Sequence, residues 1–466
     1  MKKLITLVVS VALTGCVNLA DDYQRPDAPM DSTWLESNLQ VDEVSSASTD
    51  WRQFILDPKL RELIELGLEH NRDLRIAQQT LLRTQALYGI QKSELFPNVD
   101  VSVGAANQRI PEAVTTPESI SRQYNVDVGL FSYELDFFGR IANLEQQALF
   151  NFLASEQGRR NTEIVVIGQI ASTYLSVVAD TALLNLAQET LDSQISSLQL
   201  TEQSFENGVV SGLDVAQAKV TVATAQVDLA RFRNQLAADR HALAVLVGTK
   251  FDGGLLPDDT VQQWLAPVQI GMPSDLLTLR PDIVQAEYLL MAGNANIGAA
   301  RAAYFPSISL TASSGLLSSD LDDLFSGDAR SWSFSPGLTL PIFHWGELDA
   351  NLELAEADQQ LALAQYEQTI QNAFREVADA LSARQYLAEQ LEAQKRLVDA
   401  TGESFYLSDL RFRQGVDSFY NVLDSQRSYF AAQQSLISLA YDQQNNLLSL
   451  FRALGGGWQG NPVLEQ

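Results

Sequence analysis

The residues that could act as metal ligands or nucleophiles are few in this chain and widely separated. Its three histidines, His70, His241 and His344, stand far apart and share no metal-ligand spacing. The sequence contains no phosphate-binding loop, nucleophile elbow or cysteine–histidine arrangement. Carboxylates are plentiful, but they follow helical stretches, where solvation is their usual role. We therefore expect no enzyme, no catalytic residue, no metal site and no cofactor.

The single cysteine, Cys16, follows a segment with the features of a secretory leader. Residues 1–3 include two lysines, and residues 4–13 are mostly apolar but too few to span a bilayer. Leu13-Thr14-Gly15-Cys16 resembles a bacterial lipobox, in which cleavage precedes the cysteine and its sulfur takes a diacylglycerol. We predict a signal peptide over residues 1–15 and a palmitate-type lipid anchor on Cys16. The plainer alternative is a cysteine that merely ends the leader.

Composition and charge narrow the class of protein further. The chain has 58 acidic and 31 basic residues, a formal net charge of −27, which disfavours nucleic acid and anionic lipid as partners. Alanine, leucine, glutamine and glutamate dominate long stretches, as in long packed helices. Beyond the leader we expect no transmembrane helix. Val17 stands where an aspartate would retain a lipoprotein at the inner membrane, so we expect the outer membrane.

The chain contains an internal two-fold repeat at a spacing of 207 to 209 residues. Three anchors recur in order: residues 95–101 as 304–310, 136–140 as 343–347, and 205–211 as 412–418. The predicted organisation is a lipid-anchored tail over 16–58, a first repeat over 59–260, a second over 261–454 and a C-terminal tail over 455–466. Each repeat begins with an amphipathic helix, over 60–94 and 280–304, which a proline ends.

Two strand-like segments follow each of these helices. Alternating apolar residues occur around 99–103 and 124–130 in the first repeat, and around 308–310 and 332–340 in the second. Period-2 alternation over about ten residues is typical of membrane β-strands. We predict membrane strands within residues 98–133 and 305–341. Soluble hairpins are the alternative, but four such segments in a chain with a leader favour the membrane.

Each repeat ends in a long helical hairpin. Residues 141–206 and 348–414 contain no proline, and a helix of some 66 residues reaches on the order of 100 Å. Second helices over 213–247 and 420–454 carry apolar residues at steps of three and four, the seam of a coiled coil. Glycines at the turns suit left-handed C-caps. Ser211 and Ser418 are the predicted N-caps, with Asp214 or Asn421 three residues later.

These elements together predict an α+β fold that is incomplete as a single chain. Four strands cannot close a barrel, because about eight is the smallest number that spans a membrane. Lipid does not tolerate an open sheet edge, so the strands of several chains must pair with one another. We therefore expect an oligomeric tube with a β-barrel at one end and very long coiled-coil helices at the other.

Several motifs resemble those of the TolC-like outer-membrane efflux proteins. Residues 133–140, YELDFFGR, are similar to the YELDLFGR signature of that family. Residues 22–26, DYQRP, resemble the Pro-Asp-Tyr-x-x-Pro that follows the lipidated cysteine in the lipoprotein branch, the NodT or OprM type, with Asp21 in place of the usual proline. Residues 51–58, 71–74 and 279–283 also match. The resemblance covers essentially the whole mature chain.

The resemblance implies the assembly and its partners. It implies a homotrimer with a trimeric 12-stranded transmembrane β-barrel and a helical tunnel in the periplasm. Its partners are then outer-membrane lipid, a periplasmic adaptor (membrane fusion) protein and an inner-membrane resistance-nodulation-division pump. The expected function is the passive exit duct of a tripartite efflux system for drugs or other small molecules. The alternatives are the duct of a type I protein secretion system and a lipoprotein scaffold of coiled coils without a channel.

The resemblance also assigns a closing site at the second hairpin, where Gly415 precedes Leu423-Asp424-Ser425-Gln426-Arg427. The implied gate is Tyr420, Asn421, Asp424 and Arg427. Tyr420 replaces the expected leucine, and Asn421 replaces the aspartate of the non-lipoprotein relatives. The plainer alternative for Asp424 and Arg427 is a surface ion pair at i,i+3. The candidates for adaptor docking are Gly208, Ser211, Asp214, Gln217, Gly415 and Ser418, although Asp214 and Gln217 also suit a cap and a solvated face.

Overall fold

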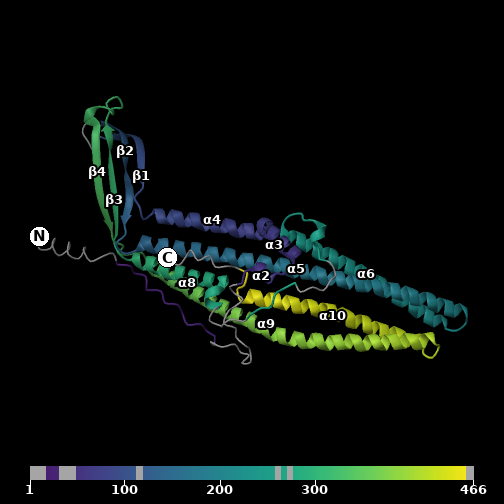
Figure 1. Cartoon of the computed structure of the whole chain (residues 1–466). Helices are drawn as coiled ribbons and strands as arrows, with labels where there is room; N and C mark the ends of the chain where they lie inside the picture. Colours follow the sequence, from purple (N-terminus) through teal and green to yellow (C-terminus); the bar gives the residue numbers. More distant parts are fainter. Residues whose placement is uncertain (1–16, 31–48, 112–118, 258–263, 270–275, 458–466) are drawn as a thin grey trace. The chain divides into compact units, whose positions relative to one another are not determined.

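The computed structural model describes residues 17–30, 49–111, 119–257, 264–269 and 276–457. Contacts divide the chain into two units. The sheet unit comprises residues 1–27, 80–156 and 285–367, and the hairpin unit comprises residues 28–79, 157–284 and 368–466. The principal elements, in chain order, are α2 (Trp51–Phe54), α3 (Pro58–His70), α4 (Arg72–Ser93), β1 (Val99–Ile110), β2 (Ser119–Leu135), α5 (Arg140–Glu206), α6 (Gly212–Val247), α7 (Leu276–Leu279), α8 (Pro281–Ala302), β3 (Ser307–Ser318), β4 (Arg330–Thr339), α9 (Glu347–Arg413) and α10 (Phe419–Ala453) (Figure 1).

The four strands form one antiparallel sheet in the order β1-β2-β3-β4 (Figure 1). Val99 pairs with Leu130, and Ser307 pairs with Thr339, so each repeat contributes one hairpin. A register shift lies between Leu130 and Tyr133, where the backbone N–H of Ser132 donates to Thr311 Oγ1 over 3.1 Å. The strands extend beyond the predicted segments because ladder hydrogen bonding continues through polar residues that lack alternation.

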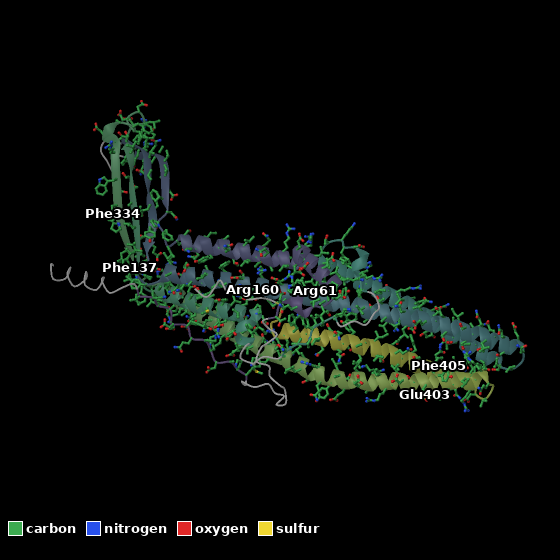
Figure 2. All side chains as sticks on the ribbon, in the orientation of Figure 1. Arg61, Phe137, Arg160, Phe334, Glu403 and Phe405 are labelled. Atoms are coloured by element: carbon green, nitrogen blue, oxygen red, sulfur yellow. The ribbon has the colours of Figure 1, made fainter. Side chains whose placement is uncertain are left out.

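One face of the sheet presents large apolar side chains to the surroundings of the single chain. Val101, Val103, Trp332, Phe334 and Leu338 are exposed, and Phe334 is seen on β4 in Figure 2. Their period-2 spacing confirms the predicted alternation. In the described residues β1 and β4 each pair on one side only. An apolar face with two unpaired edges is suited to lipid and to neighbouring strands.

The end of β2 shows why the YELDFFGR motif is chemically specific. Asp136 accepts hydrogen bonds from the backbone N–H groups of Arg140 and Ala142, each over 2.8 Å, and so caps the start of α5. Arg140 donates to both carboxylate oxygens of Glu134, over 2.9 and 2.6 Å. Gly139 has a φ of +75°, a conformation that favours glycine. The motif therefore fixes the change of direction from strand to long helix.

In the hairpin unit α5 and α6 pack along the predicted seam. Their buried cluster comprises Ala187, Leu191, Ala225, Leu229 and Phe232. By length and composition alone α5 could cross a membrane, because it contains an 18-residue window of mean hydropathy 1.4. Within this window 56% is buried in the chain. Alanine and branched aliphatic residues that pack between helices account for the high hydropathy of α5.

A compact core surrounds the first short helices. The rings of Phe54 and Phe451 stack with centroids 3.9 Å apart. The predicted single helix over 60–94 was wrong, because two helices meet at Asn71. The side chain of Asn71 donates to the Leu246 carbonyl over 2.7 Å and accepts from the backbone N–H of Leu74 over 3.0 Å. Asn71 thereby caps α4 and ties the break to the end of α6.

Arg280 explains the motif at the start of the second repeat. Its guanidinium donates to both oxygens of Asp282, to Glu376 over 2.9 Å and to the Ala453 carbonyl over 2.9 Å. These partners lie at the start of α8, on α9 and at the end of α10. Arg280 is buried, but each of these hydrogen bonds is charge-assisted. The side chain therefore links the start of α8, α9 and the end of α10.

The two hairpin turns are capped differently. Gly208 and Gly415 have φ values of +74° and +73°, as predicted for left-handed C-caps. Ser211 forms the predicted capping box with Asp214. Ser418 occupies the predicted N-cap position of α10, but its side chain makes no cap hydrogen bond, so no capping box forms there. Asn421 instead donates to Asp417 Oδ1 over 3.0 Å, which draws it toward the turn.

Candidate functional site

A groove of about 560 Å³ lies between α5, α6 and α10 near the hairpin turns. Tyr420, Asp424 and Arg427 line it from α10, and Gln217 lines it from α6. Three of the four predicted gate residues therefore share one lining. Asn421 does not belong to this lining, because its side chain is held by Asp417.

The charged residues of the groove form a pair within one chain. Arg427 Nη2 lies 2.7 Å from Asp424 Oδ1, with the side chains 78% and 54% exposed. This geometry is that of the ordinary i,i+3 surface pair. Since Tyr420 is also exposed, all three side chains are accessible to a neighbouring chain.

Two glutamines behind the gate residues were not predicted as site residues. Gln194 of α5 and Gln426 of α10 are 7% and 6% exposed and line the same groove. Gln426 donates to Ser193 Oγ over 3.4 Å, whereas Gln194 Oε1 has no hydrogen-bond partner among the described residues. Sequence reasoning missed both because glutamine is abundant along these helices.

The second turn is organised by charge. Arg411 Nε lies 2.8 Å from Asp417 Oδ2. This hydrogen bond holds the pKa of the Asp417 carboxyl below its usual value. A cavity of about 390 Å³ lies between the turns, lined by Val209, Val210 and Phe412 among others. Gly415 lines this cavity, and the space beside Gly208 and Gly415 is open.

A buried acid lies farther along the first hairpin. Asp180 of α5 is 8% exposed, and its Oδ2 has no partner among the described hydrogen bonds. Burial, and next the neighbouring Asp239 of α6, raise the pKa of Asp180 to about 7. In the second repeat the equivalent positions hold Leu387 and Asn446, so this acidic pair is not part of the repeat.

Cys16 lies outside the described residues, but the chain just after it is held firmly. The backbone N–H of Val17 donates to the Phe137 carbonyl over 3.2 Å. Farther along, Arg25 donates to both oxygens of Glu287, each over 2.7 Å, and Tyr23 donates to the same carboxylate over 3.3 Å. Glu287 is 7% exposed. The DYQRP motif therefore fastens the N-terminal strap, residues 17–27, to α8.

Comparison with known proteins identifies the family of this chain. A family model described as outer membrane efflux protein matches residues 63–249 and 272–456. The chain belongs to the outer membrane efflux protein family. It is also 44% identical to the probable efflux pump outer membrane protein TtgC of Pseudomonas putida, over 98% of this chain and 96% of the relative.

Two solved membrane proteins share the fold. A membrane protein from Pseudomonas aeruginosa is 38% identical, with a TM-score of 0.89 over 96% of this chain and 100% of the other. The open state of the MtrE outer membrane channel of Neisseria gonorrhoeae is 32% identical, with a TM-score of 0.83 over 94% and 98%. The predicted fold class, efflux function and outer-membrane location are confirmed. The chain is an outer-membrane efflux channel.

Proposed function

We propose that three copies of this chain form the exit duct of a tripartite efflux system. The main observation in support is a four-stranded sheet with two unpaired edges and an exposed apolar face, whose strands lead along the chain into helices of 67 residues. Closing such a sheet requires strands from other copies. A coiled-coil scaffold without a channel has no use for this sheet, and relatives named as efflux pump components disfavour a protein-secretion duct.

The proposed partners are a periplasmic adaptor and an inner-membrane resistance-nodulation-division pump. The helix turns suit adaptor docking, because Gly208 and Gly415 leave open space and Val209 and Val416 are exposed. Ser211 and Asp214 are engaged in the capping box, so they would shape this surface more than bind across it. Gln217 lies in the groove, beside the gate.

The proposed gate is the face of α10 that carries Tyr420, Asp424 and Arg427. In a trimer, three copies of Asp424 near the axis would repel one another unless Arg427 neutralises them. Both side chains are exposed in the single chain, which leaves them available to exchange partners between copies. Asn421 acts indirectly, through its bond to Asp417 at the turn.

Lipidation of Cys16 completes the proposal. The strap fixes Val17 at the end of the sheet, so an anchor on the preceding residue would start at the membrane end of the chain. A diacylglycerol on Cys16 carries two acyl chains, and two chains give stable membrane attachment where a single chain gives only marginal binding.

The decisive experiment is single-channel conductance in a planar bilayer, with the purified protein and the double variant Asp424→Ala, Arg427→Ala. We expect small, mostly closed currents from the unchanged protein and an open probability several-fold higher in the variant. The matched control, Glu392→Ala, Lys395→Ala, removes an equivalent exposed i,i+3 pair on α9, outside the groove. Unchanged conductance would contradict the assignment of the gate residues but not the proposed duct. Absence of current from folded oligomers would contradict the duct itself.

A further inference from the structure

A small cavity lies where the sheet gives way to helices. It has a volume of about 300 Å³ and is lined by the ends of β2, α8 and β4 and the residues that follow them. Phe137, Phe138 and Phe305 contribute aromatic walls, and the rings of Phe138 and Phe305 stack with centroids 4.7 Å apart. Figure 2 shows Phe137 at this end of the sheet. Pro306 and Pro341 continue the apolar lining.

The charged groups that line this cavity already have partners. Glu134 and Arg140 form a two-pronged ion pair, and both oxygens of Asp136 accept backbone N–H groups of α5. His344 Nδ1 lies 3.4 Å from Glu347 Oε2. A polar ligand would have to displace these contacts. The larger part of the surface that remains available to a ligand is therefore aromatic and aliphatic.

The N-terminal strap begins at the wall of this cavity. Val17 is bonded to the carbonyl of Phe137, which itself lines the cavity. Asn18 Oδ1 accepts from Asn143 over 2.8 Å and lies beside Gly139, where a Cβ would be 3.2 Å from it. Asp21 pairs with Arg301 over 2.8 Å. The strap is thus held in one register, with its first described residue at the cavity.

We propose that this cavity is a binding site, called the seat below, for part of a long acyl chain carried by Cys16. Neighbouring Cα atoms are about 3.8 Å apart, so a lipid on the residue before Val17 would be attached within about one residue of the hydrogen bond from Val17 to Phe137. A chain attached there is present at high effective concentration, which favours it over free membrane lipid as the occupant. The cavity accommodates part of one chain and leaves the other chains to the bilayer. This inference rests on the lipidation proposed above and adds a protein site for the lipid.

Photo-crosslinking of the intact, membrane-inserted protein tests the seat. The full chain is produced in a lipoprotein-processing bacterium fed with a fatty acid that carries a diazirine, and the membranes are irradiated. Mass spectrometry is then used to find peptides joined to the peptide that begins at Cys16. We expect the joined peptides to contain Phe138 or Phe305. Links confined to outward strand residues such as Trp332 and Phe334, or to phospholipid, would overturn the seat.

Two variants sharpen the result. Ala303→Phe fills the cavity and is expected to lower the yield of these links at least about five-fold, since a packed site has no room for both groups. The matched control, Ala105→Phe, adds the same bulk on exposed β1 and should leave the yield unchanged. Equal yields from both variants would contradict the seat. If Ala303→Phe does not fold, the set of crosslinked peptides from the unchanged chain still shows whether the acyl chain occupies the cavity.

The source of the chain is settled by Cys16→Ser carried behind a cleavable leader of a non-lipoprotein. This variant retains the labelled phospholipids but has no anchor, and we expect no links to the Phe138 and Phe305 peptides. Equal links would identify a membrane phospholipid as the occupant and overturn the proposal. Intact mass is measured first: absence of lipid on Cys16 would contradict lipidation itself and the seat with it, whereas lipid without links would contradict the seat alone.

Discussion

The two long hairpins arise from one repeated pattern, yet the chain buries them differently. Ile170 and Tyr174 of α5 correspond to Val377 and Leu381 of α9, and all four are buried. Farther toward the turns α5 continues to bury residues as far as Thr201. In α9 no residue from 382 to 413 is buried in the described chain.

This difference separates a packed hairpin from one that lacks a complete set of neighbours. The outer part of α5 packs on α6 through Leu191 and Phe232, whereas the outer part of α9 relies on partly exposed contacts such as Phe405 with Tyr429, 6.1 Å apart. The proposed gate residues lie on α10, which is paired with this less buried stretch of α9, although Phe419 and Val422 of α10 are themselves buried. A gate must move at low energetic cost, and low burial is the property that permits this.

The largest expected effect comes from the packed seam. Leu191→Ala removes a buried side chain and should weaken the α5–α6 hairpin by about 2–4 kcal/mol. The equivalent change, Val398→Ala in α9, should cost less than about 1 kcal/mol because Val398 is only partly buried. Native-state hydrogen exchange of the two hairpins in detergent measures both. Equal losses would mean that the hairpins are equally packed.

The acidic pair provides the second test. The folded state keeps the Asp180 proton up to about pH 7, whereas an unfolded chain loses it near its ordinary pKa of 3.8. The folded state therefore binds more protons between these values, and stability falls as pH rises through that window. Asp180→Asn should abolish this fall and stabilise the hairpin at pH 8 by about 2 kcal/mol. Hydrogen exchange at pH 5 and pH 8 checks the sign, and a variant that is weaker at pH 8 would contradict it.

The caps provide a smaller contrast. Ser211→Ala breaks the capping box and should destabilise the start of α6 by about 1 kcal/mol. Ser418→Ala should change the start of α10 by only about 0.2 kcal/mol, because that side chain forms no cap hydrogen bond. Exchange rates of amides in the first turn of each helix distinguish the two. A larger loss at Ser418 would mean that it does cap α10 in the assembled protein.

The smallest stability effect belongs to the proposed gate. Arg427→Ala removes an exposed pair and should cost the isolated hairpin about 0.3 kcal/mol. The same variant should still raise channel open probability, because its proposed role lies between copies. Stability and conductance measured on one preparation separate these roles. A large loss of hairpin stability without a change in conductance would make Arg427 a structural residue.

The sequence by itself determined most of the architecture. Period-2 alternation and the repeat spacing located the four strands, and the proline-free stretches placed the long helices to within a few residues. These signals are local, since side-chain periodicity follows directly from backbone geometry. The Ser211 cap and the glycine turns were predictable for the same reason.

Tertiary structure determined the helix break, the capping and the burial that local sequence patterns do not encode. The break at Asn71 depends on the Leu246 carbonyl, and Asn421 forms no capping box because its side chain donates to Asp417. Asp180, Gln194 and Glu287 are buried, and their neighbours, such as Arg25 of the strap beside Glu287, come from segments far away in the sequence. Identical spacing in two repeats therefore produced unequal hairpins, because burial depends on the neighbours each helix meets and not on its own period.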